Sequence, residues 1–297
     1  MKFLISNDDG VHAPGLLALF QALSTIGEVV VVAPSDEQSG CSSALSVTKP
    51  LHTHQLDSGF IAVNGSPADC IYLALHELYQ DTRFDCIITG INSGANLGQD
   101  VLFSGTFGAA LTAQLCGLPA IATSLVGGGV KGRSEGQERG QEDASHYQMA
   151  ANEIVKLLTE TSLLDVCKSL PYHVLNVNIP DVDNSADIKG RKVTSLGHSP
   201  IARPVYHMVD PRGRDAYWLS LRKRKNALSD SGLGKDSSEA SQLQNKPPLE
   251  NIDEDVNNVA VVMTDDQAVA AGYISLSPVR LHHTPKRALD KLSALVL

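Results

Sequence analysis

The stretch KFLISNDDGVHAPGLLALFQALSTIGEVVVVA, residues 2–33, decides the fold of this chain. Residues 2–6 are mostly apolar and predict a buried strand. Pro14 then opens a pattern with apolar residues on one face, as in an amphipathic helix. Residues 28–33 are rich in valine, which is typical of a strand covered on both sides in a parallel sheet. Strand, helix and strand in this order predict a right-handed β-α-β unit.

The same alternation continues through the first half of the chain. We expect further strands at residues 60–63, 86–89 and 120–122, and helices at residues 67–79 and 106–116. Such repeated alternation predicts an α/β fold with a mostly parallel, doubly wound sheet.

The second half of the chain differs in character. We expect a helix at residues 147–158, a strand at residues 174–178 and a closing helix at residues 286–296. Between them lie three short strand-like runs, at residues 192–195, 204–208 and 217–219. Runs of this length predict antiparallel excursions or hairpins rather than β-α-β units.

Two further segments have no apolar periodicity, and we expect them to be loops inserted at the surface. One is rich in Gly, Glu and Gln, and the other in acidic residues, Ser and Asn. We therefore interpret residues 1–297 as one domain. Its core spans about residues 1–180 and 259–285, and its hairpin extension spans about residues 190–225. The two insertions lie at about residues 127–144 and 226–258.

The composition excludes several classes of protein. Lys and Arg number 24 against 33 Asp and Glu, and the net charge of −9 disfavours binding to nucleic acid or to anionic membranes. No apolar run approaches the ~20 residues of a membrane helix, and the apolar start is too short for a signal peptide, so we expect a cytoplasmic protein. Five widely spaced cysteines without a C-x-x-C pair argue against a disulfide framework and against a zinc site.

The sharpest chemical signal is Asn7-Asp8-Asp9-Gly10, directly after the first strand. In an open parallel sheet, ligands bind beyond the carboxyl ends of the strands. Adjacent carboxylates repel one another, and a hard divalent cation such as Mg²⁺ or Mn²⁺ relieves that repulsion. The alternative interpretation is a helix-capping acid followed by a turn acid.

A second polar loop follows the valine-rich strand. Residues 34–43 read PSDEQSGCSS, and such a loop can bring hydroxyl and backbone N–H groups to the same crevice. His12 is a further candidate for that crevice, with packing in a turn as the alternative.

The third signal follows the strand expected at residues 86–89. Residues 90–98 read GINSGANLG, and Ser104-Gly105-Thr106 stands at the start of the next helix. Asn amide oxygens can coordinate a hard cation. The Ser and Thr hydroxyls with the helix N-terminal amides can bind an anion, although the same hydroxyls can also cap the helix. The pattern is neither a P-loop nor a G-x-G-x-x-G fingerprint.

Taken together, the three loops indicate a cation beside a phosphate. The chemistry that they predict is hydrolysis of a phosphoester by a metal-activated water. Donors at Asn96, Ser104 and Thr106 would hold the charge that spreads over the phosphoryl oxygens.

Several motifs resemble the SurE survival-protein family, which consists of metal-dependent nucleoside monophosphate phosphatases. They are LISNDDGVHAPG, VVAPSDEQSGCSSALS, NGSPADC, GINSGANLGQDVLFSGTFGAA, LNVNIP and TDDQAVAAGYISLSP. The resemblance is dense over about residues 1–125 and looser over about residues 170–285. It implies a Rossmann-like core with a hairpin and a C-terminal segment that exchange between subunits, in a homodimer or homotetramer.

The resemblance also implies roles for individual residues. One divalent cation per subunit, Mg²⁺ or Mn²⁺, would be held by Asp8, Asp9, Ser39 and Asn92. The phosphate would be held by Asn96, Ser104, Gly105 and Thr106. Asp8 or Asp9 would handle the proton of the attacking water.

The expected activity is that of a 5′-nucleotidase, which hydrolyses nucleoside 5′-monophosphates, and also 3′-monophosphates, to nucleoside and phosphate. Two alternatives remain open on the sequence. One is a nucleotide-binding regulatory protein without turnover, and the other is an exopolyphosphatase that uses the same site.

Overall fold

The computed structural model describes residues 1–127, 144–182, 184–198, 205–219, 262–280 and Ser293. The described residues fall into two compact units, which we treat separately: residues 1–199 with 263–297, and residues 200–262. The insertion expected at 226–258, nearly all of that expected at 127–144, and the closing helix except Ser293 lie outside the described residues.

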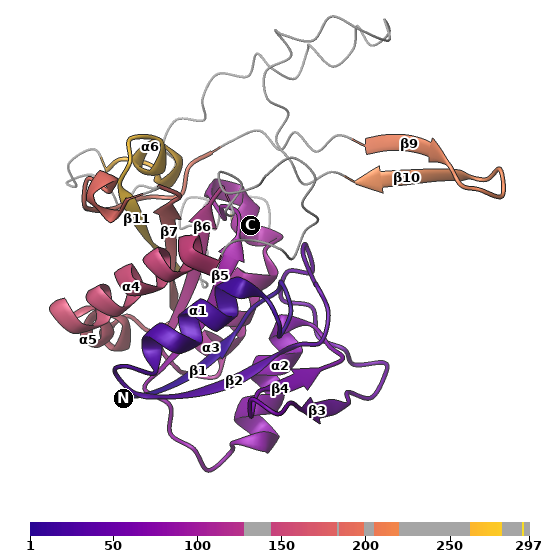
Figure 1. Cartoon of the computed structure of the whole chain (residues 1–297), viewed down its shortest axis with the longest axis horizontal. Coiled ribbons are helices and arrows are strands. Elements are labelled where there is room, and N and C mark those ends of the chain that lie inside the picture. The colour runs from indigo at the N-terminus through magenta and orange to yellow at the C-terminus, as the bar shows by residue number, and fades with distance from the viewer. Residues whose placement is uncertain (128–143, 183, 199–204, 220–261, 281–292, 294–297) are drawn as a thin grey trace, which may run out of the picture. The chain divides into compact units, whose positions relative to one another are not determined.

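The larger unit is built on a nine-stranded, mixed but mostly parallel sheet (Figure 1). In sheet order, its strands are β3 (Thr53–Gln55), β4 (Ile61–Val63), β2 (Glu28–Pro34), β1 (Lys2–Ser6), β5 (Cys86–Ser93), β6 (Ala120–Val126), β7 (His173–Pro180), β11 (Ile274–Arg280) and β8 (Arg191–Val193). Six of the pairings are parallel, whereas β3 with β4 and β7 with β11 are antiparallel.

Helices cover both faces of this sheet. They are α1 (Pro14–Leu23), α2 (Pro67–Leu73) with a π-helical continuation η1 (Ala74–Leu78), α3 (Gly105–Leu115), α4 (Ala144–Glu160), α5 (Leu163–Ser169) and α6 (Asp265–Ala270), besides the 3₁₀ turns η2 (Gly98–Leu102) and η4 (Ser185–Asp187). Because side chains alternate along a strand, Phe3 and Ile5 pack under α1 and α4, while Leu4 packs under α2 and α3. The expected doubly wound α/β arrangement is thus confirmed.

In the later part of the sheet, two strands differ from the sequence prediction. Residues 192–195 were expected in a hairpin, but β8 instead pairs in parallel with β11, about 80 residues further along the chain. Strand β11 itself was not expected, because its sequence ISLSPVR interrupts the apolar residues with serines and a proline. Ser275 and Ser277 are nonetheless buried, and the hydroxyl of Thr194 bonds both at 2.7 Å. Buried hydroxyls that satisfy one another can therefore replace an apolar pattern.

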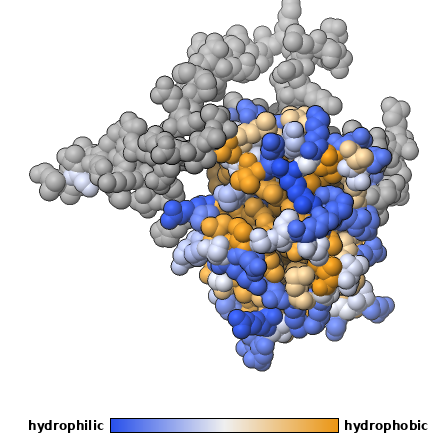
Figure 2. Space-filling view, turned by 90° about the vertical axis from the view of Figure 1, so that its left-hand side faces the viewer, coloured by the Kyte–Doolittle hydropathy of each residue, from blue (hydrophilic) through white to orange (hydrophobic). Residues whose placement is uncertain are grey.

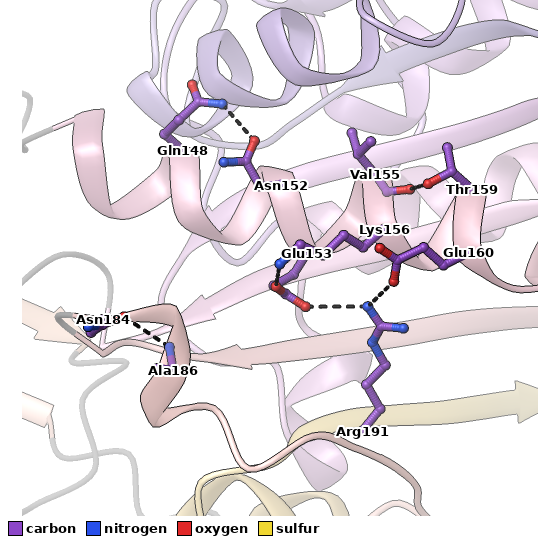
Figure 3. Close-up of polar contacts among 10 residues, drawn as sticks. All are labelled: Gln148, Asn152, Glu153, Val155, Lys156, Thr159, Glu160, Asn184, Ala186 and Arg191. Carbon is purple, nitrogen blue, oxygen red and sulfur yellow. Dashed lines mark hydrogen bonds and ion pairs between the residues drawn. The ribbon is translucent and has the colours of Figure 1, made fainter.

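Charged side chains tie the edge strand β8 to helix α4, as Figure 3 shows. Arg191 of β8 lies 3.4 Å from Glu153 and 3.7 Å from Glu160. Lys156 also reaches Glu153, at 2.6 Å. Glu153 is buried, so these two cations balance a carboxylate that would otherwise destabilise the fold.

The smaller unit contains an antiparallel hairpin of β9 (Val205–Val209) and β10 (Asp215–Leu219). This confirms the hairpin expected from the runs at residues 204–208 and 217–219. Its strands expose large apolar side chains, among them Tyr206, Tyr217 and Trp218.

The described surface mixes polar and apolar residues, and the face in Figure 2 has apolar patches surrounded by hydrophilic residues. Within the described ranges, we find no helix with both the length and the apolarity that crossing a membrane requires. All five cysteines are free thiols.

Candidate metal and phosphate site

The candidate site lies where the direction of the sheet connections reverses. From the central strand β1 the chain first adds β2 and β4 on one side, and then crosses to β5 on the other. The loops at the carboxyl ends of strands diverge at such a point and leave a crevice for ligands. The residues predicted for metal and phosphate binding lie at or near these strand ends and at the start of α3: Asp8, Asp9, Ser39, Asn92, Asn96, Ser104, Gly105 and Thr106.

Asp8 forms the buried side of the site. Its side chain accepts a hydrogen bond from the hydroxyl of Thr106, and the residue is 3% exposed. Burial raises the pKa of Asp8, although hydrogen bonds from Thr106 and from the Gly105 backbone act in the opposite direction. No Lys or Arg of the described chain forms an ion pair with Asp8. A cation bound here would stabilise its charged form.

Asp9 joins the end of β1 to the end of β5. Its Oδ2 accepts a hydrogen bond of 3.0 Å from the backbone N–H of Ser93. The neighbouring Asn92 donates its Nδ2 to the carbonyl of Gly94 at 2.9 Å, which leaves Oδ1 as the atom for a cation. The register of β5 against β6 shifts between Thr89 and Asn92, and such irregularities re-aim side chains next to functional sites.

Ser39 approaches from the loop after β2. This loop is fastened to β1, because the N–H of Gln38 donates to the carbonyl of Asp8 at 2.7 Å. Ser39 is exposed, and its hydroxyl donates to Oε1 of Glu37 at 2.8 Å. Ser39 and Asp9 line one cavity of about 320 Å³, which Glu37 and His12 also line. The sequence-based candidate His12 therefore does reach the crevice.

The start of α3 forms the inner wall. Ser104 caps the helix by accepting the N–H of Phe107 at 3.0 Å, so the capping alternative is correct for this hydroxyl. A methyl group on Gly105 would lie 2.8 Å from Cβ of Asp8 and 2.9 Å from Sγ of Cys41. A glycine is therefore needed for the helix N-terminus to approach Asp8 this closely. The positive end of the helix dipole lies at this terminus and favours a bound anion.

Asn96 is committed to the scaffold. Its Nδ2 donates to the hydroxyl of Ser124, and its backbone N–H donates to Oδ1 of Asn178, both at 2.9 Å. The Asn96 carbonyl accepts from the side chains of Asn176 at 2.8 Å and Asn178 at 3.0 Å. These bonds fix the loop between β5 and α3.

The donor set fits a hard divalent cation. Asp8, Asp9, Ser39 and Asn92 offer oxygen atoms alone, as Mg²⁺ and Mn²⁺ prefer. The described residues contain no group of three or more His, Cys, Asp or Glu placed to hold a metal. A cation between these four would thus depend on the hydroxyl and the amide as well as on the carboxylates.

Cys41 lies beside this set but does not change its character. Burial, assisted by the charge of Asp8, raises the pKa of the Cys41 thiol to about 11. The thiol therefore stays protonated at neutral pH and is a poor nucleophile and a poor ligand for a soft metal.

Two supporting elements lie in motifs that the sequence analysis quotes, LNVNIP and TDDQAVAAGYISLSP, but their residues were given no role there. Asn176 and Asn178 alternate with apolar residues in LNVNIP, so a polar residue at every second position of a buried strand was the available signal. Asp265 is fully buried and accepts the N–H groups of Gly98 and Gly197, both at 2.7 Å. It ties α6 to the turn that leads to α3, although the two are far apart in sequence.

The profile of the protein family described as "Survival protein SurE" matches residues 3–203. The chain belongs to the SurE family. A relative named 5′-nucleotidase SurE from Psychrobacter cryohalolentis is 68% identical over 297 residues, which is the full length of both chains. A relative of the same name from Acinetobacter baylyi is 40% identical over 296 residues, again 100% of both. The crystal structure of a SurE protein from Aquifex aeolicus covers 100% of both chains with a TM-score of 0.69 and 30% identity.

Proposed function

We propose that the chain is a divalent-metal-dependent 5′-nucleotidase that hydrolyses nucleoside 5′-monophosphates, and also 3′-monophosphates, to nucleoside and phosphate. The observation that carries this proposal is the position of Asp8, buried against the N-terminus of α3 with Asp9 beside it. One edge of the sheet thereby offers a cation ligand set and an anion site side by side. The relatives named 5′-nucleotidase SurE support the same activity.

We assign one Mg²⁺ or Mn²⁺ to Asp8, Asp9, Ser39 and Asn92. When bound, such a cation supplies Lewis-acid polarisation of the phosphoryl group and makes a water molecule more acidic. Asp8 or Asp9 takes the proton of the attacking water as its oxygen forms a bond to phosphorus. The bond from phosphorus to the sugar oxygen breaks, that oxygen takes a proton from solvent, and the carboxyl group returns its own proton to solvent.

The start of α3 and the loop before it hold the phosphoryl oxygens. The backbone amides of Gly105 and Thr106, which also act on the carboxylate of Asp8, stand at the positive end of the helix, where developing negative charge is stabilised. The Ser104 hydroxyl can donate to an oxygen while it still caps the helix. Asn96 keeps the loop in place and has its Nδ2 and its backbone carbonyl committed to the scaffold, so its part in phosphate binding is mainly to position this wall.

The decisive experiment is a phosphate-release assay with EDTA-treated protein and then with Mn²⁺ restored. We expect release from nucleoside 5′-monophosphates, and more slowly from 3′-monophosphates, that depends on the metal. Nucleotide binding without release would favour the regulatory protein. Release from short polyphosphate alone would favour the exopolyphosphatase.

We also propose that the chain forms a homodimer or homotetramer through the β9–β10 hairpin. An isolated two-stranded hairpin is marginally stable in water, and this one exposes Tyr206, Tyr217 and Trp218. A second copy of the chain that covers these side chains would remove the free-energy cost of exposing them to water. Light scattering after chromatography should give the mass of at least two chains, and the double variant Tyr206→Ser with Trp218→Ser should lower it.

A further inference from the structure

A carboxylate outside the predicted ligand set contacts one of its members. Glu37 is two residues before Ser39 in the loop after β2, and both side chains are exposed. The Ser39 hydroxyl donates to Oε1 of Glu37 at 2.8 Å. Glu37, Ser39 and Asp9 all line the same cavity of about 320 Å³.

The backbone that carries this pair is fixed. Between Glu37 and Ser39, the N–H of Gln38 donates to the carbonyl of Asp8 at 2.7 Å. An atom added at Cα of Gly10 would lie 3.5 Å from the carbonyl carbon of Asp36 and 3.7 Å from the nitrogen of Glu37. The loop therefore rests on the end of β1, while the side chains on either side of Gln38 remain in the cavity.

A serine hydroxyl that ligates a cation does so through a lone pair on its oxygen. Its hydrogen must then point away from the cation, and the ligand is stronger when an acceptor takes that hydrogen. Glu37 is such an acceptor, and its charge increases the electron density on Oγ of Ser39.

We propose that Glu37 is a positioning residue for the cation, which orients the Ser39 hydroxyl with its lone pairs toward Asp8 and Asp9. This inference rests on the proposed function, because Ser39 must be a ligand. It adds to that function a third carboxylate, one that acts through Ser39 rather than on the cation itself.

The neighbouring Asp36 provides a matched control. Asp36 is also exposed, lines the same cavity and carries the same charge. The hydrogen bond from Ser39 goes to Glu37. Removing the charge at position 36 therefore tests the electrostatic field of the cavity, whereas truncating residue 37 tests the field together with the hydrogen bond.

The experiment is a direct Mn²⁺ titration of metal-free full-length protein by calorimetry, with free Mn²⁺ also followed by electron paramagnetic resonance. We expect Glu37→Ala to raise the Kd for Mn²⁺ about tenfold, the lower end for loss of a partner behind a ligand. Glu37→Gln keeps an acceptor oxygen and should raise the Kd for Mn²⁺ by less than Glu37→Ala does. Asp36→Asn should change it less than twofold. The Mn²⁺ concentration for half-maximal phosphate release should rise in the same order.

The coupling to Ser39 is the critical readout. In a Ser39→Ala background, Glu37→Ala should have no further effect on the Kd. The inference is overturned if Glu37→Ala weakens binding as much in that background, or if Asp36→Asn weakens it as much as Glu37→Ala. An unchanged Kd in Glu37→Ala, with wild-type protein that binds Mn²⁺ and releases phosphate, refutes the inference alone. Wild-type protein that does neither refutes the proposed function.

Discussion

The two sides of the candidate site are held in different ways. Asp8 is 3% exposed and packs against the start of α3, where the hydroxyl of Thr106 and the backbone of Gly105 surround its carboxylate. Ser39 and Glu37 are exposed on a loop whose backbone alone is fastened to β1. A buried group keeps its geometry before any ligand arrives, whereas an exposed hydroxyl is oriented by a single neighbour. The inner side of the site, at Asp8, should therefore determine the rate of phosphate release. The outer side, at Ser39 and Glu37, should adjust the affinity for the cation.

The largest effect is expected at the inner carboxylate. Asp8→Asn removes the charge of a proposed ligand, and we expect phosphate release to fall at least ~10²-fold. Asp57→Asn is the control, because it makes the same substitution at an exposed residue of the turn before β4. Steady-state assays at saturating Mn²⁺ test this prediction. Near-normal turnover in folded Asp8→Asn protein would contradict the assignment.

A steric change at the inner side should have the next largest effect. In Gly105→Ala the new methyl would press on Asp8 and Cys41, so we expect about a tenfold or greater loss of turnover and about 1–3 kcal/mol of destabilisation. Gly108→Ala on the same helix would instead press on the carbonyl of Ser42, 2.2 Å away. Urea denaturation and activity should separate the two variants. Equal loss of turnover at equal stability would show that closeness to Asp8 does not matter.

Behind the inner side, Asn178 should matter mainly for stability. Asn178→Ala leaves the buried N–H of Asn96 without its acceptor, and we expect a cost of about 1–3 kcal/mol in the free energy of unfolding. Asn184→Ala should cost less, about 0.5 kcal/mol, because the exposed Asn184 side chain only accepts the N–H of Ala186 at the start of η4. Denaturant titration of both variants measures the difference, and similar values for the two would argue against the scaffold role of Asn178.

The smallest effect concerns pH. Burial raises the pKa of Asp8, so in metal-free protein the fold favours the protonated carboxyl. The stability from this group is present below its ordinary pKa and is lost as the pH rises through the higher value of the folded state. The free energy of unfolding of Asp8→Asn should therefore rise relative to wild type between pH 4 and pH 7. If the free energies of unfolding of wild type and Asp8→Asn run parallel over this pH range, Asp8 titrates as it does in the unfolded chain.

The sequence predicts the first half of the molecule well, and the reasons are physical. Strand β1 is an apolar run that is almost wholly buried, β2 is a valine run whose second half is buried, and α1 repeats its apolar residues with the period of a helix. Asp8 and Asp9 could be placed at a strand end because carboxylates do not belong inside such a run. The later strands β8 and β11 could not be paired, since β8 contains three residues and β11 buries serines.

The support of the site was harder to predict than its candidate ligands. The hydrogen bond from Ser39 to Glu37 and the one from Asn96 to Asn178 depend on side-chain directions, which residue types do not specify. Asp265 accepts a hydrogen bond from the N–H of Gly98, which is 167 positions away in the sequence. A contact between residues so far apart leaves no local sequence pattern.

The late position of Asp265 has a consequence for how the molecule is made. Every predicted ligand has been synthesised once the ribosome has passed Thr106, yet the residue that ties the turn before α3 is added much later, followed by β11 between β7 and β8. A nascent or prematurely terminated chain would carry all the predicted ligands without the hydrogen bond from Gly98 to Asp265 that holds the turn before α3. Phosphate release should therefore begin only when the chain is complete, although every predicted ligand is present earlier.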